Sequence, residues 1–553
     1  MLHRARLRDW TLDRVFAGRA EASPDAPFLH SALTGDTLTF AEAFDRARAM
    51  AARLSAWGVS PGERVAVMAS NSLAALNCWF ALNLAGATDV SINPANRGHV
   101  LEYLVNRSGA SRLIIERSLL PVLLEIEDAL PALKEVFHFC AEGDEESGAL
   151  PASRRLSVRP LASLPDVPVS GWVAPQIDGA DVASVLFTSG TSGPSKGVMV
   201  RHAHALLSAR SCALGVRMSA DDSLYCFHPF FHMAAKHCGI LSALLAGARV
   251  VIDHRFDPEI WLDSIIRHGI TIALGHGPML EMIHQQPQRP GEADTTLTRL
   301  ICAPVPKHIA ADFERRFGVR AIEIWGMSEL GLPCWRPFDA PLVPGSCGPV
   351  LSEWFELRVV DPATGDELPR GGVGELRVRP RDSTIVMAGY LDDEAATAAC
   401  WNDGWFCTGD AGSMDEDGWV HVHDRMTDRI RRRGENISPA DIEFAASGYP
   451  SVVEAVAVGV PSGFVSDEDI KMFVVGEAAD AIDPEGLLRW LAERLPHYMV
   501  PRYIEVLQEL PRTPTGKVRR SELRKRGAGP GIWDRKAAGI ELRQLISEVR
   551  EGP

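Results

Sequence analysis

The chain has 553 residues, of which 46% are hydrophobic and 23% are charged, a balance typical of folded globular proteins and unlike that of disordered or fibrous chains. Its formal net charge of -15 argues against non-specific binding of nucleic acid, which needs a basic surface. At roughly 150 residues per domain, the length predicts several folding units or a few large ones.

The ends and the cysteines point to a cytoplasmic protein. The first ten residues are charged and lack the apolar segment of a signal peptide. The most apolar stretch, residues 241–252, is too short for a membrane span and is interrupted by Gly247 and Arg249. The ten cysteines include no Cys-x-x-Cys pair, which argues for a reducing compartment and against structural zinc.

Strands and helices are expected to alternate along most of the chain. Residues 64–69 are typical of a buried strand, and Ser72 is typical of the N-cap of a helix over 73–85 that ends at Gly86. Strands are also expected over 248–252, 273–275 and 321–325, with a helix starting at Asp257 and Pro258. This order predicts an α/β fold with mostly parallel sheets.

Residues 182–200 predict a phosphate-binding loop between two strands. Two apolar runs flank the segment TSGTSGPSKG (188–197), which holds three glycines, five hydroxyl side chains and Lys196. Glycines let backbone N–H groups approach phosphate oxygens, while hydroxyls and a lysine add further donors. The Walker pattern fails at Ser195 and Gly197, so a GTPase or kinase loop is excluded. The competing interpretation is a flexible surface loop.

The character of the sequence changes towards the C-terminus. Alternating residues over 356–378 predict an antiparallel β section, and the charge-dense segment 424–443 marks a domain boundary. We therefore expect a large, multi-lobed N-terminal domain (1–423), a small mobile α+β lid (424–527), and a linker with a tail helix (528–553) that docks on its own domain. Residues 1–423 carry 37 basic and 51 acidic residues, against 20 and 21 in the remainder.

Five segments in order resemble the adenylate-forming superfamily, which includes acyl-CoA synthetases, aryl-CoA ligases, peptide-synthetase adenylation domains and firefly luciferase. They are the glycine-rich loop, IWGMSE (324–329), GWFCTGD (404–410), RMTDRI (425–430) and LPRTPTGK (510–517). The segments RRRGENIS (431–438) and DEDIKMFV (467–474) most resemble bacterial CoA ligases of the crotonobetaine/carnitine type.

The resemblance implies an acid–thiol ligase acting in two half-reactions. A small carboxylic acid attacks the α-phosphate of ATP, giving an acyl-adenylate and pyrophosphate, and coenzyme A then displaces AMP. Bringing one anion to another requires charge neutralisation and alignment. The implied cofactors are ATP, Mg²⁺ and coenzyme A.

The resemblance also assigns roles to single residues. Ser328 would bind the α-phosphate, and Glu329 would hold Mg²⁺, since a hard cation prefers oxygen ligands. Trp325 replaces the usual tyrosine that stacks on adenine, next to Gly326. Lys517 would bridge the α-phosphate and the acid. The implied ATP-binding residues also comprise Thr188, Ser189, Gly190, Thr191, Ser192, Gly193, Lys196, Asp410 on the ribose, and Arg425.

The resemblance places the coenzyme A site and the hinge in the lid. Gly434 would face the pantetheine tunnel, and Arg431, Arg432 and Arg433 would meet the coenzyme A phosphates, unless they form a solvated charge run. Thr427 stands where relatives carry a charged hinge residue, so its role as a hinge is open.

The acid pocket is expected around the HPFFH turn (228–232). His232 resembles the histidine that gates the acid site, and a metal pair of His228 and His232 is the alternative. Lys236 or His237 would meet a polar or anionic group on the acid, unless Lys236 points into solvent. Cys302 stands where relatives carry glycine and would reshape the pocket. The remaining expected pocket residues are Phe231, Gly239, Gly275, Ala303 and Pro304.

Four other interpretations compete with a complete acyl-CoA ligase. The enzyme could load a carrier protein instead of coenzyme A, or be specialised to one half-reaction, as the substitutions at Trp325, Cys302 and Thr427 would allow. A nucleotide sensor without catalysis is a third interpretation. Luciferase-like oxidation is a fourth, and no residue supports it. A homodimer is the commonest assembly for such chains.

Overall fold

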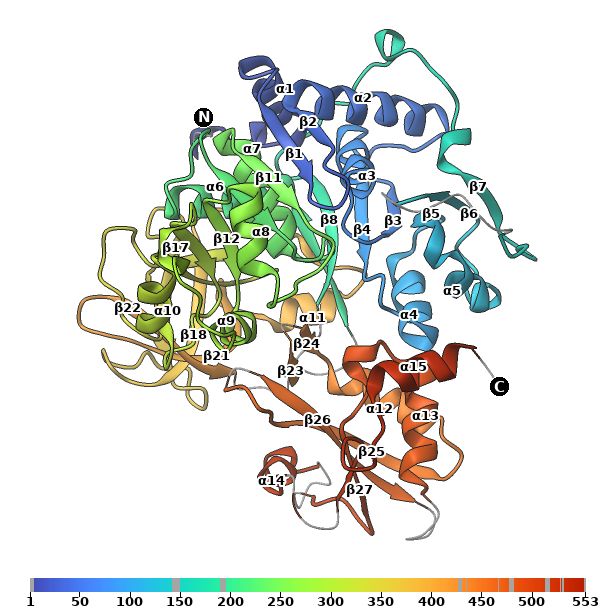
Figure 1. The fold of residues 1–553 in the computed structure, drawn as a ribbon, viewed down its shortest axis with the longest axis vertical. Coiled ribbons are helices and arrows are strands. Elements are labelled where there is room, and N and C mark those ends of the chain that lie inside the picture. Colours follow the sequence, from blue (N-terminus) through green and yellow to red (C-terminus); the bar gives the residue numbers. More distant parts are fainter. Residues whose placement is uncertain are drawn as a thin grey trace. The chain divides into compact units, whose positions relative to one another are not determined.

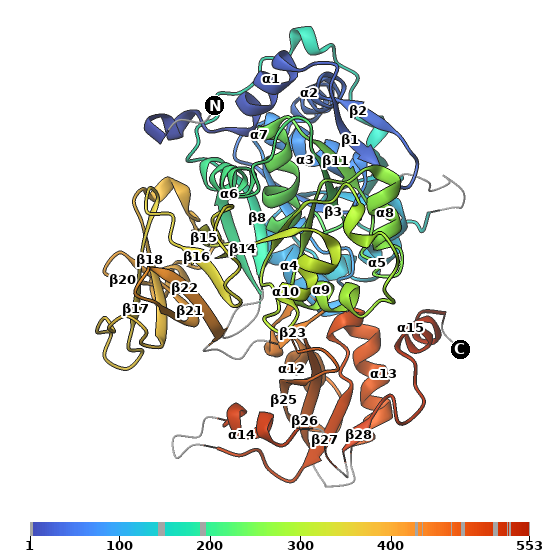
Figure 2. The same cartoon turned by 60° about the vertical axis from the view of Figure 1, so that its left-hand side comes forward.

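The computed structural model describes residues 4–141, 150–188, 195–425, 430–433, 435–465, 467–476, 482–512, 518–527, 529 and 532–551. The chain folds into two compact units (Figures 1 and 2). Unit 1 comprises Met1–Pro94, Val105–Phe187 and Gly197–Asp424. Unit 2 comprises Ala95–Leu104, Thr188–Lys196 and Arg425–Pro553.

One eight-stranded sheet has the order β19-β9-β8-β4-β3-β5-β6-β7, and β8 through β7 run parallel. The connections between its parallel strands include helices, as parallel crossovers require. The strands are β3 (Arg64–Met68), β4 (Thr88–Ile92), β5 (Arg112–Glu116), β6 (Glu135–Phe139), β7 (Ser157–Pro160), β8 (Val182–Thr188), β9 (Lys196–Arg201) and β19 (Gly389–Tyr390). The helices of this part are α3 (Leu73–Leu84), α4 (Gly98–Ser108) and α5 (Leu120–Glu125).

A second eight-stranded sheet has the order β15-β14-β13-β12-β10-β11-β1-β2, parallel except for its two edge strands. Its strands are β1 (Pro27–Ser31), β2 (Thr37–Thr39), β10 (Ser223–Cys226), β11 (Arg249–Ile252), β12 (Ile272–Gly275), β13 (Arg299–Cys302), β14 (Arg320–Met327) and β15 (Gly331–Trp335). The helices are α1 (Leu12–Ala22), α2 (Phe40–Ala56), α6 (His202–Gly215), α7 (Ser242–Ala246), α8 (Trp261–His268), α9 (Gly277–His284) and α10 (Ala310–Phe317).

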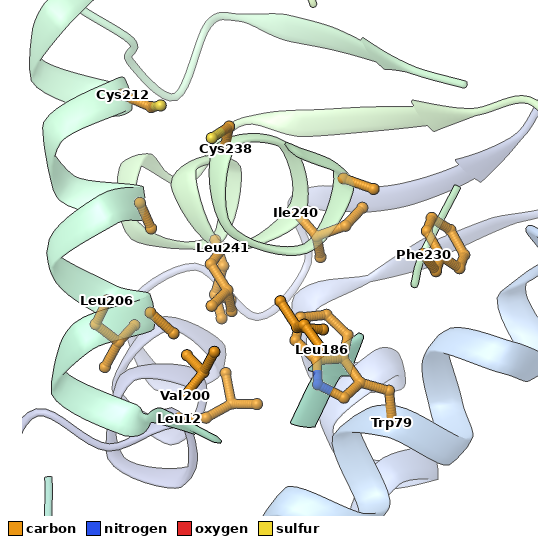
Figure 3. Close-up of a cluster of buried hydrophobic side chains, with 14 of the residues drawn as sticks. Leu12, Trp79, Leu186, Val200, Leu206, Cys212, Phe230, Cys238, Ile240 and Leu241 are labelled. Atoms are coloured by element: carbon orange, nitrogen blue, oxygen red, sulfur yellow. The ribbon is translucent and has the colours of Figure 1, made fainter. Parts of the chain in front are cut away.

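The hydrophobic core of unit 1 includes the packing of α6 against a π-helix, η6 (Ala234–Leu241), shown in Figure 3. Leu206 and Cys212 of α6 lie beside Cys238 and Leu241 of η6, and Trp79 of α3 lies in the same cluster. Ten of the twelve residues of α3 are buried, as expected for a helix that is apolar all round. A π-helix is rare and occurs frequently at functional sites, which makes η6 a candidate for a functional element.

Unit 1 also contains the expected antiparallel β section. In its six-stranded sheet, β17 pairs antiparallel with β18, with Glu356 opposite Arg379, so the prediction for 356–378 is confirmed. The strands are β16 (Ser346–Pro349), β17 (Phe355–Val360), β18 (Gly374–Pro380), β20 (Trp401–Asn402), β21 (Trp405–Met414) and β22 (Trp419–Arg425), and helix α11 covers Glu394–Ala399.

Unit 2 is a small α+β body. Its four-stranded sheet has the order β25-β26-β27-β28, and helix α15 packs on α13 in the same unit, where Leu545 is buried. Its elements are β23 (Ile430–Arg432), β24 (Glu435–Ile437), α12 (Pro439–Ser447), β25 (Val452–Pro461), β26 (Glu468–Gly476), α13 (Pro484–Arg494), β27 (Tyr503–Leu507), α14 (Arg520–Lys525), β28 (Trp533–Asp534) and α15 (Leu542–Glu551).

The local signals in the sequence are mostly confirmed. The Ser72 hydroxyl accepts a hydrogen bond from the backbone N–H of Ala75 and caps α3, and Gly86 adopts the left-handed conformation after that helix. The helix expected from Asp257 begins instead at Trp261. The reason is local, because the Asp257 carboxylate accepts from the Glu259 N–H in a turn that precedes the helix. No helix in the described part of the chain is long and apolar enough to cross a bilayer.

Candidate active site

Several predicted site residues come together where parallel strands of the second sheet end. Gly275 ends β12, Cys302 ends β13, and Trp325 lies near the end of β14. His232 follows the adjacent strand β10 through a short turn. Ligands of open α/β sheets bind outside the carboxyl ends of the strands, so this edge is the candidate active site.

The turn that carries His232 is held by a side chain that the sequence patterns did not predict. The Asn71 side-chain amide donates to the carbonyls of His228 and Asp253, and its oxygen accepts from the Phe230 N–H. The His232 N–H donates to the Pro229 carbonyl, and the Phe231 and His232 rings lie 4.4 Å apart. Asn71, which is far from the turn in the sequence, therefore fixes its conformation. The only sequence signal for Asn71 is its position after β3 and next to the helix cap Ser72.

The ends of β12 and β13 form one wall of the site. Gly275 pairs with Cys302, and the Ala303 N–H donates to the Gly275 carbonyl, with Pro304 following in a cis peptide. A side chain at Gly275 would come within 2.9 Å of Leu280. The Cys302 side chain is completely buried, and this burial raises the pKa of its thiol well above the ordinary value. Cys302 is thus an inert packing group at neutral pH.

Trp325 and Asp410 are brought into direct contact. The indole N–H of Trp325 donates to a carboxylate oxygen of Asp410 on β21 at 2.9 Å, and both side chains are buried. Next to Trp325, any side chain on Gly326 would collide with the Gly331 carbonyl, at 1.9 Å. The replacement of the usual tyrosine therefore provides an N–H donor that orients Asp410. The sequence predicted both residues but not this bond.

Glu329 lies in the turn between β14 and β15, one residue after Ser328. The Tyr390 hydroxyl donates to its carboxylate at 2.8 Å, and the Met387 N–H donates to its carbonyl at 2.9 Å. Its side chain is buried, so the carboxylate is held in one direction. A single oriented carboxylate suits Mg²⁺, which keeps waters and binds substrate phosphates. The sequence patterns did not predict Tyr390, which lies in the short strand β19 shortly before α11.

Lys236 is buried rather than exposed to solvent, so the solvent alternative is wrong. Its exposed fraction is 2%, and its ammonium pairs with Asp89 and donates to the Ser91 hydroxyl at 2.7 Å. The ammonium also lies 4.8 Å from the Trp79 ring. Burial lowers the pKa of Lys236, whereas Asp89 opposes that shift. The partner is an acidic residue in β4, far away in the sequence.

His237 and Gly239 share η6 with Lys236. The His237 ring is buried and lies 6.5 Å from the ring of His204 on α6. Gly239 packs against β10, because a Cβ atom there would come within 3.3 Å of the Cys226 sulfur.

Part of the predicted nucleotide site lies outside the described residues. Thr188 ends β8 and Lys196 opens the neighbouring strand β9, so the loop does join two adjacent strands. Arg425 ends β22. The predicted residues outside the described part are Ser189, Gly190, Thr191, Ser192, Gly193, Thr427, Gly434 and Lys517.

The three arginines at 431–433 are not a uniform cationic surface. Arg432 is buried, and its guanidinium donates to the carbonyls of Tyr498 and Val500, at 3.3 and 2.7 Å. Burial lowers its pKa to about 10. Arg432 thus links β23 to the segment before β27, and the expectation that it meets a coenzyme A phosphate is wrong. Arg433 is exposed, with a left-handed backbone.

The structure gives no support to a histidine metal pair. Within the described ranges, no group of three or more His, Cys, Asp or Glu side chains is arranged to hold a metal ion. The His228 ring instead stacks on Phe227 at 4.8 Å and meets the edge of His276 at 5.8 Å. Burial lowers the pKa of His228 to about 3.

Comparison with curated proteins identifies full-length relatives. The chain is 33% identical over 520 residues to a feruloyl-CoA synthase from an Amycolatopsis species, covering 92% of this chain and 97% of that protein. It is 31% identical over 519 residues to a 3-[(3aS,4S,7aS)-7a-methyl-1,5-dioxo-octahydro-1H-inden-4-yl]propanoyl:CoA ligase from Mycobacterium tuberculosis, covering 90% and 96%. A crotonobetaine/carnitine–CoA ligase from Salmonella typhimurium is 28% identical over 478 residues, covering 84% and 89%.

The fold is likewise shared with solved structures. ATP-bound MatB from Rhodopseudomonas palustris superposes with a TM-score of 0.66 at 27% identity, covering 93% of this chain and 98% of that one. Two family models match in order: the AMP-binding enzyme model over residues 16–391 and the AMP-binding enzyme C-terminal domain model over residues 441–517. The first match alone covers more than half of the chain, so this protein belongs to the AMP-binding enzyme family.

Proposed function

We propose that the protein is an AMP-forming acid–thiol ligase. It activates a carboxylic acid with ATP, releases pyrophosphate, and transfers the acyl group to coenzyme A. The observation that carries this proposal is that two carboxylates are fixed around the carboxyl end of β14: Asp410 is held by Trp325 near the end of that strand, and Glu329, in the turn after it, is held by Tyr390. The curated relatives, which match over most of their length, are named as a CoA synthase and as CoA ligases.

Each carboxylate has a distinct task in the first half-reaction. Asp410, an oriented acceptor, binds the two ribose hydroxyls of ATP. Glu329 would hold Mg²⁺, and the cation would supply positive charge near the phosphates of ATP. Ser328 donates to the α-phosphate from the same turn. The chain thereby aligns two anions and offsets their repulsion, which is most of what this reaction needs.

Cations of the chain complete this charge balance. Lys196 opens β9 at the end of the glycine-rich loop and neutralises the β- and γ-phosphates. Lys517 bridges the α-phosphate and the attacking carboxylate. Arg425 contacts ribose or phosphate. Coenzyme A is the acceptor thiol, and Arg433 rather than Arg432 meets its phosphates. Loading of a carrier protein is the alternative outcome of the acceptor assay.

The test separates the two half-reactions with Lys517→Ala. We expect a loss of pyrophosphate release by at least 100-fold, because the lysine acts only while the acid attacks ATP. Thioester formation from supplied acyl-adenylate and coenzyme A should change less than about threefold.

Lys525→Ala, which removes an exposed lysine from α14 in the same unit, serves as the matched control and should leave both rates unchanged. Equal losses of the two half-reactions in Lys517→Ala would contradict the assigned role. Absence of pyrophosphate release from the wild type with every acid tested would instead contradict the proposed activity.

A further inference from the structure

Two buried histidines next to the candidate acid site have ring nitrogens without partners. His204 on α6 and His237 on η6 have exposed fractions of 1% and 2%. Both ring nitrogens of His204 and Nδ1 of His237 make no hydrogen bond to any described residue. Buried polar atoms are nearly always hydrogen-bonded in native proteins, so three such atoms at one place call for a ligand or water.

The two rings face each other in an edge-on arrangement. Their centroids lie 6.5 Å apart with an interplanar angle of 61°. Figure 3 shows the two helices that carry them, α6 and η6, packed side by side. Since the helices are fixed by the apolar core around Leu206 and Leu241, the imidazoles are held rigidly. Rigid polar groups of this kind favour one ligand geometry over others.

The two histidines lie next to two segments of the candidate active site, the one that carries His232 and the one that carries Glu329. The backbone N–H of Lys236, the residue before His237, donates to the carbonyl of His232. A Cβ atom on Gly331 would lie 3.2 Å from Nε2 of His204, so this ring packs against the chain two residues beyond Glu329. His237 is therefore one residue beyond the helical turn that starts at His232, and His204 packs against the segment that follows Glu329.

Burial disfavours the charged form of both imidazoles. Burial lowers the pKa of His204 to about 3, and the charge of Arg201 adds to this effect. Burial also lowers the pKa of His237 well below its ordinary value, with further contributions from His204 and Lys236. A neutral imidazole offers one donor and one acceptor, which suits a hydroxyl or a carbonyl.

The two cations that lie near the pair in the described part of the chain, Lys236 and Arg201, are already engaged by other groups. The Lys236 ammonium is paired with Asp89 and bonded to Ser91. The Arg201 guanidinium donates to the carbonyls of Val386 and Met387, both at 3.1 Å, and to that of Ser383. An anionic group placed at the histidines would therefore be buried without compensation, at a large energetic cost.

We propose that His204 and His237 form the specificity end of the acid site and bind a neutral hydrogen-bonding group, a hydroxyl or a ketone, on the acyl part of the substrate. This inference rests on the proposed function and adds to it the class of acid: a monocarboxylic acid with a neutral polar group distant from the carboxylate. Acids with an apolar or an anionic group at that position are rejected, because the buried nitrogens stay unpaired or the charge stays uncompensated.

The test uses matched acids on the full-length protein with ATP and Mg²⁺. Three scaffolds (arylpropenoic, phenylacetic and straight-chain alkanoic) each carry a distal hydroxyl, methyl or carboxylate. Pyrophosphate release provides kcat/KM, and calorimetry provides the dissociation constant of each acid. We expect at least one scaffold to show a tenfold or greater preference for the hydroxyl over both the methyl and the carboxylate.

Two variants of His237 then test whether the histidine pair causes this preference for the hydroxyl acid. His237→Phe keeps an aromatic ring but removes both nitrogens, and it should reduce the hydroxyl preference to below threefold. His237→Gln restores a donor and an acceptor and should keep the preference. His138→Phe, a buried histidine on β6 of the other sheet, controls for the general effect of such a substitution.

The outcomes separate this inference from the proposed function. No hydroxyl preference on any scaffold, or an unchanged preference in His237→Phe, overturns the inference and leaves water as the partner of the nitrogens. If no acid supports pyrophosphate release, the proposed function fails, and the ratio of dissociation constants still decides the role of the histidines.

Discussion

At the scale of single residues, the buried pair of Lys236 and Asp89 replaces apolar packing in the middle of the large unit. Their exposed fractions are 2% and 1%, so each charge depends on the other for compensation. Removing one partner of a buried ion pair typically costs about 3–5 kcal/mol, whereas replacing both by apolar groups is often neutral or stabilising.

The double-mutant cycle of Lys236→Met and Asp89→Val tests this dependence. We expect the free energy of unfolding to fall by about 3–5 kcal/mol in Lys236→Met and to recover most of that loss in the double variant, measured by denaturant titration. The double variant also tests contact with the substrate. An unchanged ranking of acids excludes Lys236 as their recognition group, and a changed ranking would contradict its purely structural role.

Trp325 makes a second residue-scale contribution, through the hydrogen bond to Asp410. Trp325→Phe keeps an aromatic ring at the proposed adenine site but removes the indole N–H that donates to Asp410. Hydrogen bonds to charged groups contribute about 1.5–3 kcal/mol, so we expect KM for ATP to rise by about 10-fold or more with a smaller change in kcat.

Steady-state kinetics with saturating acid would measure this effect. Trp172→Phe is the matched control, because Trp172 donates to the Ser55 hydroxyl at 3.1 Å, away from the site. Equal kinetic constants for wild type and Trp325→Phe would show that Asp410 does not need this donor.

At the scale of elements, the short local signals are reliable because they act within a few residues. Helix α2 begins with a complete capping box, in which the Thr39 hydroxyl accepts from the Glu42 N–H and the Glu42 carboxylate accepts from the Thr39 N–H. Helix α1 also starts after a threonine, but the Thr11 hydroxyl makes no capping bond.

Threonine-to-valine substitutions at these two positions remove the hydroxyl group but keep the shape of the side chain, so they measure the contribution of the capping hydrogen bond. Thr39→Val should lower the free energy of unfolding by about 1 kcal/mol, because it leaves a helix N-terminal N–H unsatisfied. Thr11→Val should be neutral or slightly stabilising, since its hydroxyl is buried without a partner. Thermal or chemical unfolding measures both, and equal losses at the two sites would contradict the capping argument.

The elements that could not be predicted depend on distant residues. The sequence pattern indicates a helix after His232 but not that it is a π-helix, because that choice depends on packing against α6 and β10. Helix α8 begins at Trp261, later than predicted, for a local reason: the turn at Asp257 competes with the first turn of the helix.

At the scale of the whole molecule, the buried histidines of unit 1 and the buried Asp441 of unit 2 predict opposite responses to acid. In unit 1, burial lowers the pKa of His202 to about 4 and those of His204 and His228 to about 3. Their unfolded pKa is near 6.5, so protonation favours the unfolded state as the pH falls below 6.5. In unit 2, burial raises the pKa of Asp441 to about 6. Its unfolded carboxyl binds fewer protons, so acid favours the folded state between pH 6 and 4.

Calorimetry at pH 7.5 and pH 5.5 tests this division. The three histidines together should destabilise unit 1 by about 4 kcal/mol over that range, at about 1.4 kcal/mol per proton and pH unit. Glu323 opposes this destabilisation. Burial raises the pKa of its carboxyl to about 8, so in the folded state this group binds a proton that it does not bind in the unfolded state, and acidification favours folding. In Glu323→Gln the histidine effect should therefore be seen in full.

We expect the unfolding transition of unit 1 to move to lower temperature on acidification, with a larger shift in Glu323→Gln than in the wild type. The transition of unit 2 should move less or move upwards. A common shift of both transitions would contradict the assignment of the acid-sensitive groups to unit 1.

The sequence by itself determined the family, the α/β class and the antiparallel section, and it predicts the residues of the nucleotide site. These follow from contiguous motifs such as IWGMSE (324–329) and from caps such as Ser72, whose physical causes lie within a few residues. The tertiary structure alone decided which side chains are partners. It placed Asn71 on the His232 turn, Tyr390 on Glu329, Asp89 on Lys236 and His204 on His237. In each case the partners are far apart in the sequence, and burial in a shared, low-dielectric interior is what makes their pairing necessary.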